Sequence, residues 1–254
     1  MPLPRRHFLT SAAAFAALPA RAATAPVIAA AASLRFVMAD LETAFPDALR
    51  VSFGSSGTLS QQLRNGAPFE LFLSADEAYV QGLAHDGHLP DDGVIYARGR
   101  LSLIVPKSGD MEADATLDAL EARLTAGHLR RFAIANPEHA PYGIRAREAL
   151  IHRGLWQGLQ PFLVLGENVA QAAQFAVSGN ADGGLVAASL ASAGPLAARA
   201  RSALIAEDWH SPLNQRMALT PRAGTVARTF FDFLQSNEAR AIFARHGFAA
   251  PEPA

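Results

Sequence analysis

Short apolar runs alternate with amphipathic segments of helical length between Val27 and about Ile205. Such alternation is typical of βαβ units, in which each strand is followed by a helix that packs on the sheet. The pattern predicts an α/β fold with mostly parallel sheets flanked by helices. The predicted strands are residues 27–31, 49–53, 70–73, 101–105, 131–134, 162–165, 184–187, 203–206 and 216–219. The predicted helices are chiefly residues 58–65, 117–125, 143–153, 169–178, 225–235 and 238–246.

The chain is long enough for two domains, with 254 residues and a mass of 26.8 kDa. The predicted strands 101–105 and 216–219 are flanked by Pro106 and Pro221, and they enclose a self-contained run of helices and strands. We therefore expect two lobes joined by two crossover strands, with a ligand cleft between them at the carboxyl ends of parallel strands. The expected limits are residues 23–100 and 208–254 for the first lobe and residues 101–207 for the second.

The N-terminal segment has the pattern of an export signal. Arg5 and Arg6 precede an apolar run that ends in Ala20-Arg21-Ala22, a typical cleavage site. The run is too short to be a membrane anchor, which needs about 20 apolar residues. We expect residues 1–22 to be removed and the product to reach the periplasm. The paired arginines fit the twin-arginine route, while the general secretory route stays open.

Composition excludes several classes of function. The chain has no cysteine, so disulfides, thiolate nucleophiles, cysteine-ligated metal sites and a lipidated cysteine are excluded. The formal net charge is −1, and the basic residues form no dense cluster of the kind that binds a phosphate backbone. We therefore expect no nucleic-acid partner.

Four predicted strand-to-helix turns carry small or hydroxyl residues where a helix begins. They are residues 31–33, 54–58, 136–143 and 166–169. The first turn of a helix has unpaired N–H groups and the positive end of the helix dipole, so such a turn can bind an anion. The alternative is that Ser33, Ser56 and Asn168 are ordinary N-caps. Convergence of all four turns on one cleft would favour the anion site.

Five segments make a resemblance specific. They are residues 30–34 (AAASL), 52–59 (SFGSSGTL), 74–76 (SAD), 136–143 (NPEHAPYG) and 243–248 (FARHGF). In this order, and over essentially the whole chain after the signal segment, they resemble the periplasmic molybdate-binding proteins of ABC importers. The resemblance implies a type II periplasmic-binding fold that holds molybdate or tungstate between two lobes.

By position, the resemblance implies ligand contacts from Ser33 and Ser56 in the first lobe, and from Tyr142 and the backbone N–H of Val169 in the second. Many members place a ligand tyrosine in the strand where this chain has Ala187. We expect the Tyr142 hydroxyl to supply the missing donor. The alternative is that Tyr142 only packs at the rim of the cleft.

The resemblance implies a solute-binding protein rather than an enzyme. It implies no cofactor, a membrane permease as partner, molybdenum held only as the oxyanion, and a monomer. Two other functions stay open, namely binding of another tetrahedral oxyanion such as sulfate, and an enzyme on the same fold. An enzyme would need a base beside a nucleophile, and the turns show only hydroxyls.

Other candidate motifs have plainer interpretations. His85 and His88 have the H-x-x-H spacing of metal ligands, with Asp86, Asp91 and Asp92 nearby, but Gly and Pro around them predict a solvated loop. The sequence Gly54-Ser55-Ser56-Gly57-Thr58 fails the G-x-S-x-G pattern at its last position. Glu138 and His139 lie between two prolines, which favours a rigid turn over an acid and base pair.

Overall fold

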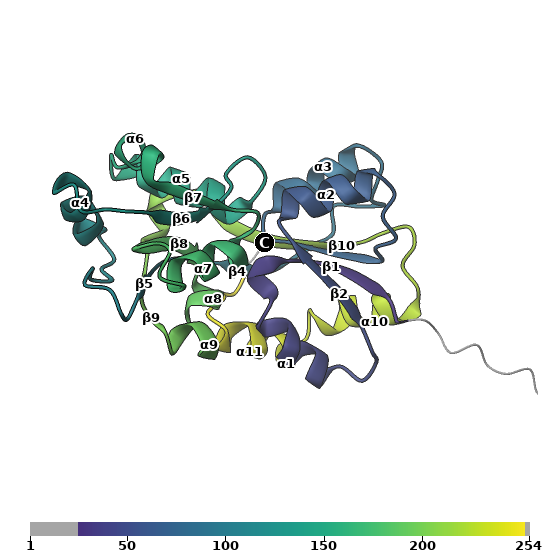
Figure 1. Ribbon diagram of the computed structural model, residues 1–254. Coiled ribbons are helices and arrows are strands. Elements are labelled where there is room, and N and C mark those ends of the chain that lie inside the picture. Colours follow the sequence, from purple (N-terminus) through teal and green to yellow (C-terminus); the bar gives the residue numbers. More distant parts are fainter. Residues whose placement is uncertain (1–24, 252–254) are drawn as a thin grey trace, which may run out of the picture.

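The computed structural model describes residues 25–251, and the expected signal segment lies outside them. It confirms the predicted two-lobe α/β fold (Figure 1). The first sheet has the strand order β2-β1-β3-β10-β4, formed by β1 (Val27–Ala31), β2 (Arg50–Gly54), β3 (Leu71–Ser74), β4 (Val94–Gly99) and β10 (Leu213–Leu219). The second has the order β7-β6-β8-β5-β9, formed by β5 (Leu101–Pro106), β6 (Phe132–Ala135), β7 (Leu163–Gly166), β8 (Gly183–Ala187) and β9 (Ala200–Leu204).

Four strands of each sheet run in one direction and the fifth runs against them. The reversed strand is β10 in the first sheet and β5 in the second, and each pairs antiparallel with both of its neighbours. Each is also the first strand after the chain crosses between lobes, at Arg100 before β5 and at residues 205–212 before β10. The parallel strands end at the face where the lobes meet, so the turns that follow them lie between the lobes.

Helices cover both sheets. The first lobe carries α1 (Val37–Ala44), α2 (Ser56–Arg64), α3 (Glu77–His85), α10 (Thr225–Phe233) and α11 (Asn237–Arg245). The second carries α4 (Asp118–Thr125), α5 (Pro141–His152), α6 (Trp156–Leu159), α7 (Val169–Val177), α8 (Ala188–Ala191) and α9 (Gly194–Ala197). Short 3₁₀ turns are η1 (Ala32–Leu34), η2 (Gln160–Phe162) and η3 (Glu207–Trp209).

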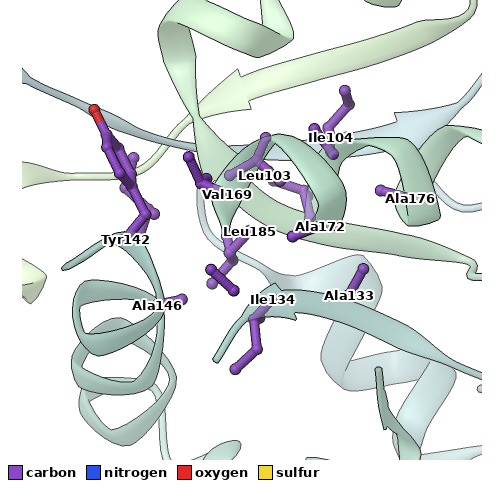
Figure 2. Packing of buried hydrophobic residues seen from close by; sticks show 14 of the residues in the cluster. Leu103, Ile104, Ala133, Ile134, Tyr142, Ala146, Val169, Ala172, Ala176 and Leu185 are labelled. Carbon is purple, nitrogen blue, oxygen red and sulfur yellow. The ribbon is translucent and has the colours of Figure 1, made fainter. Parts of the chain in front are cut away.

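Alternation along the central strands of the first sheet divides its core into two layers. Ile28 and Leu71 pack toward α1, α10 and α11, whereas Ala29 and Phe72 pack toward α2 and α3. This division follows from the strand period, because successive side chains point to opposite faces. In the second lobe, apolar residues of the sheet and of α5 and α7 form one core (Figure 2).

Three strands differ from the sequence-based prediction by more than one residue. Strand β4 was not expected, β9 spans Ala200–Leu204 instead of residues 203–206, and β10 begins at Leu213 instead of residue 216. Strand β9 is an edge strand with mostly exposed side chains. The prediction relied on apolar residues, and these lie at the end of the strand and just beyond it, so the predicted range was placed too late in the chain. Among residues 25–251, no helix combines the length and the apolar character that crossing a membrane requires.

Candidate functional site

A small hollow lies between the two lobes. Its atom-free space of about 200 Å³ includes space that is open to solvent. Its lining residues are Ala31, Ala32, Ser33, Gly54, Ser55, Ser56, Ala75, Ala140, Pro141, Tyr142 and Val169. They come from the turns after β1, β2 and β3 in the first lobe, and from the starts of α5 and α7 in the second. The lining residues are all uncharged. We call this space the interlobe hollow.

The four residues singled out from the sequence all line the interlobe hollow. Ser33 is the middle residue of η1, and Ser56 is the first residue of α2. Tyr142 is the second residue of α5, and Val169 is the first residue of α7. The structure therefore brings together side chains that are up to 136 positions apart in the chain, counting from Ser33 to Val169.

Three α-helices begin at the hollow. The starts of α2, α5 and α7 lie around it, and N–H groups of a first helical turn have no partner within the helix. The positive ends of three helix dipoles therefore face the same space. This arrangement favours an anion without a cationic side chain.

The hydroxyl groups of Ser33 and Ser56 are available as donors. Ser56 Oγ accepts the backbone N–H of Ala75 at 2.9 Å, so its own proton is left for another acceptor. Ser33 Oγ is fully buried, in a residue that is 1% exposed, and it lies near the Tyr142 hydroxyl but outside hydrogen-bond geometry. A buried hydroxyl without a partner is unfavourable unless a ligand satisfies it.

The capping alternative holds for one of the three residues. Asn168 does cap α7, because its side-chain oxygen accepts the N–H groups of Ala170 and Gln171. Helix α2 is capped by Ser55, whose Oγ accepts the Thr58 N–H at 3.2 Å. Ser56 and Ser33 form no cap hydrogen bond.

Tyr142 is a buried phenol that reaches from the second lobe toward the first. The residue is 2% exposed, and its hydroxyl points away from α5 and away from the apolar side chains of the second lobe's core (Figure 2). Gln215 Nε2 donates to this hydroxyl at 3.1 Å. Burial raises the pKa of Tyr142, and the nearby Ser33 and Gln215 side chains oppose that shift only in part. The phenol therefore keeps its proton and can donate it.

Ala187, where the resemblance predicts a ligand tyrosine in many members, contributes no donor to the hollow. Ala187 ends β8, is fully buried and does not line the interlobe hollow. Two residues later, Ser189 Oγ donates to the Ser33 carbonyl at 2.8 Å. This bond joins the lobes and fixes η1, on which Ser33 lies.

A direct contact between His139 and α2 was not predicted from the sequence. The His139 carbonyl accepts the Gly57 N–H at 3.0 Å and the Tyr79 hydroxyl at 3.3 Å. The His139 Nδ1 atom lies 2.8 Å from Ser55 Oγ. The contacts of this turn between the two prolines hold the second lobe against the first.

The metal-ligand interpretation of the histidine spacing has no structural support in the described part of the chain. His85 is the last residue of α3 rather than part of a loop, and His88 lies in the turn beyond it. Within residues 25–251, no three His, Asp or Glu side chains gather in a metal-binding group.

Comparison with known proteins agrees with this geometry. A family model described as bacterial extracellular solute-binding protein matches residues 26–249. Molybdate-binding protein ModA of Rhodobacter capsulatus is 33% identical over 202 residues, covering 78% of this chain and 75% of that protein. ModA of Escherichia coli K12 is 31% identical over 226 residues, 86% of each chain. The structure of the periplasmic molybdate-binding protein of Azotobacter vinelandii has a TM-score of 0.80 at 27% identity, covering 89% of this chain and 100% of that one. This chain therefore belongs to the bacterial extracellular solute-binding proteins.

Proposed function

We propose that this protein captures molybdate or tungstate in the interlobe hollow and delivers it to the membrane permease of an ABC importer. Export to the periplasm, by a signal peptide at residues 1–22, is part of the proposal. The relatives at 33% and 31% identity are molybdate-binding proteins, which supports this choice of anion. We further propose that the protein acts as a monomer and needs no cofactor.

The observation that carries the proposal is the set of donors around the hollow. Three helix starts, the unpaired Ser33 hydroxyl and the protonated Tyr142 phenol face one uncharged space. A tetrahedral dianion offers only acceptors, so N–H and O–H groups can satisfy it. A buried Lys or Arg would itself need desolvation, whereas helix dipoles supply a favourable field without a full counter-charge.

We assign the contacts as follows. Ser33 and Ser56 donate from the first lobe through their hydroxyl and backbone N–H groups. Tyr142 donates through its hydroxyl and Val169 through its backbone N–H from the second. Because the donors come from both lobes, a bound anion favours the closed arrangement.

Calorimetric titration of the purified protein with molybdate, tungstate, sulfate and phosphate tests the proposal. We expect one molybdate or tungstate per chain and much weaker binding of sulfate. Equal or tighter binding of sulfate would show that the ligand is another tetrahedral oxyanion and not molybdate. No binding of any of the four anions would refute an oxyanion site.

One observation favours the alternative of an enzyme. Ser55 Oγ lies 2.8 Å from His139 Nδ1, and His139 Nε2 lies 4.0 Å from a carboxylate oxygen of Glu167. However, Ser55 Oγ donates its proton to Thr58 Oγ1 at 2.8 Å and accepts the Thr58 N–H as the cap of α2, and Glu167 is largely exposed. Turnover of a panel of activated esters that disappears in Ser55→Ala would establish the enzyme, and absence of turnover supports the binding protein.

A further inference from the structure

A buried polar chain runs from the first lobe to the Tyr142 hydroxyl. Gln215 lies on β10 of the first lobe and is completely buried. Its Oε1 accepts the hydroxyl proton of Tyr96 at 2.8 Å, and its Nε2 donates to Tyr142 Oη at 3.1 Å. Tyr96 lies on β4, so two strands of the first lobe hold the tip of a side chain from α5 of the second.

The direction of these hydrogen bonds determines where the Tyr142 proton points. An amide nitrogen only donates, so Tyr142 Oη accepts from Gln215 and must direct its own O–H elsewhere. The Ser33 side chain lies close enough to the phenol to affect its pKa. Both residues line the interlobe hollow. The Gln215 amide therefore leaves the phenol proton for an acceptor in the hollow.

A reversed amide would have the opposite effect. Its oxygen would face Tyr142 Oη and draw the phenol proton away from the hollow. The Tyr96 hydroxyl opposes this reversal, because it donates to the amide oxygen in the present arrangement. Tyr96 Oη also lies 3.3 Å from the Ser74 carbonyl oxygen, a second possible acceptor for its single proton, but the 2.8 Å distance to Gln215 Oε1 is the shorter one and favours the present amide orientation.

Gly99 at the end of β4 provides an independent observation. Its backbone is not in the left-handed region, so conformation does not require glycine there. A Cβ at this position would collide with Tyr142 Oη and would lie 2.7 Å from Gln215 Nε2. Glycine inside a strand often marks a close approach of another group. Here it leaves room for the contact between the phenol and the amide.

We propose that Gln215 is a positioning residue of the binding site, which directs the Tyr142 hydroxyl proton toward the bound anion. This inference rests on the proposed function, because it assigns a donor to the anion in the interlobe hollow. Gln215 itself does not line the hollow and acts through Tyr142. Tyr96 holds the amide in the orientation that this role requires.

The test is a double-mutant cycle measured by calorimetric titration with molybdate. Gln215→Met keeps the length of the side chain and removes both hydrogen bonds, and Gln215→Glu replaces the donor by an acceptor. In the wild-type background we expect Gln215→Met to weaken binding about 5- to 20-fold, the range of an ordinary to strong hydrogen bond. Gln215→Glu should weaken it further, because its carboxylate takes the phenol proton and repels the anion.

The Tyr142→Phe background separates positioning from general damage. Without the phenol oxygen, Gln215→Met should change the affinity by less than about twofold, since coupled residues show non-additive effects. Equal losses in both backgrounds would overturn the proposal, and so would wild-type affinity in Gln215→Met. If Gln215→Met does not fold, Tyr96→Phe provides the same cycle, with a smaller loss expected in the wild-type background alone.

A spectroscopic measurement reports the phenol directly. The chain has three tyrosines, so ¹³C labelling of the ring carbon that bears the hydroxyl gives signals that Tyr142→Phe assigns. Addition of molybdate should shift the Tyr142 signal in the wild type and much less in Gln215→Met. An equal shift in both proteins would overturn the positioning role. If wild-type protein binds no molybdate, the proposed function fails, and the inference fails with it.

Discussion

Gly57 allows the two lobes to come together, and its substitution should separate closure from folding. A Cβ at Gly57 would lie 2.5 Å from the His139 carbonyl oxygen and 2.9 Å from the His139 Cβ. Gly57 is the second residue of α2 and has ordinary helical backbone geometry, so alanine fits the first lobe by itself. We therefore expect Gly57→Ala to hinder only the approach of the second lobe.

The magnitude follows from the contacts that would be stretched. Carbon and oxygen atoms tolerate approaches of 3.0 to 3.4 Å, so the turn around His139 must recede by about 0.5 to 0.9 Å. Such a shift weakens the 3.0 Å bond from the Gly57 N–H and the 2.8 Å contact between Ser55 and His139. With about 0.5 to 1.5 kcal/mol for each bond, the closed state loses about 1 to 3 kcal/mol. Molybdate affinity should then fall about 5- to 150-fold, because the ligand must drive a less favourable closure.

The assay combines three measurements on Gly57→Ala and on a matched control. Calorimetry gives the molybdate affinity, small-angle scattering gives the compaction on binding, and thermal unfolding without ligand gives stability. Gly82→Ala is the control, because Gly82 lies in α3 of the same lobe and a Cβ there meets only the end of the Arg64 side chain at 3.6 Å. In helices alanine is more stable than glycine, so neither variant should melt earlier. Unchanged affinity and compaction in Gly57→Ala would refute the reasoning, as would a fall in melting temperature that parallels the loss of affinity.

Three further outcomes are expected. Ser56→Ala should weaken molybdate binding by about 1.5 to 3 kcal/mol, the range for a hydrogen bond to a charged group, and should also lower the melting temperature because the buried Ala75 N–H loses its acceptor, although Ser55 keeps the cap; a fall in melting temperature at constant affinity would mean a purely structural serine. Tyr142→Phe should weaken titrated molybdate binding by a similar amount and reduce compaction in scattering, and unchanged values would make Tyr142 a rim residue. Burial alone would raise the pKa of Asp182, but N–H donors from Arg130 and the charges of Arg130 and Arg123 lower this pKa overall. The ionised carboxylate therefore stabilises the fold at every pH above its unfolded pKa of about 4. Asp182→Asn should therefore melt earlier than wild type at neutral pH, with a difference that shrinks as the pH falls through the native pKa, whereas a pH-independent difference would contradict this origin.

The sequence predicted the elements that are defined by local pattern. The strand at residues 27–31 and the helix starts after the parallel strands have clear apolar runs and turn residues. Val169 could be placed at a helix start for this reason. Ser55 and Ser56 both line the hollow, and local pattern could not tell which of them caps α2, because a shift of one residue in the helix start decides it.

Contacts between the lobes could not be predicted from local pattern. Gln215 and Tyr142 are 73 positions apart, and Ser55 and His139 are 84 apart. Their proximity depends on how two separately folded sheets are oriented, and no short-range periodicity encodes that. Gly99 belongs to the strand that was not expected, so its role in making room for the phenol was hidden as well.

The residues that hold the lobes together are already fixed within their own lobe. Ser55 caps α2 and also contacts His139, and Asp76 caps α3 through Oδ1 while its other oxygen pairs with Arg145 of the second lobe. A side chain that is already ordered as a cap loses little rotamer freedom when it gains a second partner. Charge is used in this outer ring of contacts, where Arg145 and Asp76 compensate each other, and is kept out of the hollow. Closure can therefore be favourable without placing a cation beside the anion, and discrimination among anions is left to the placement of neutral donors.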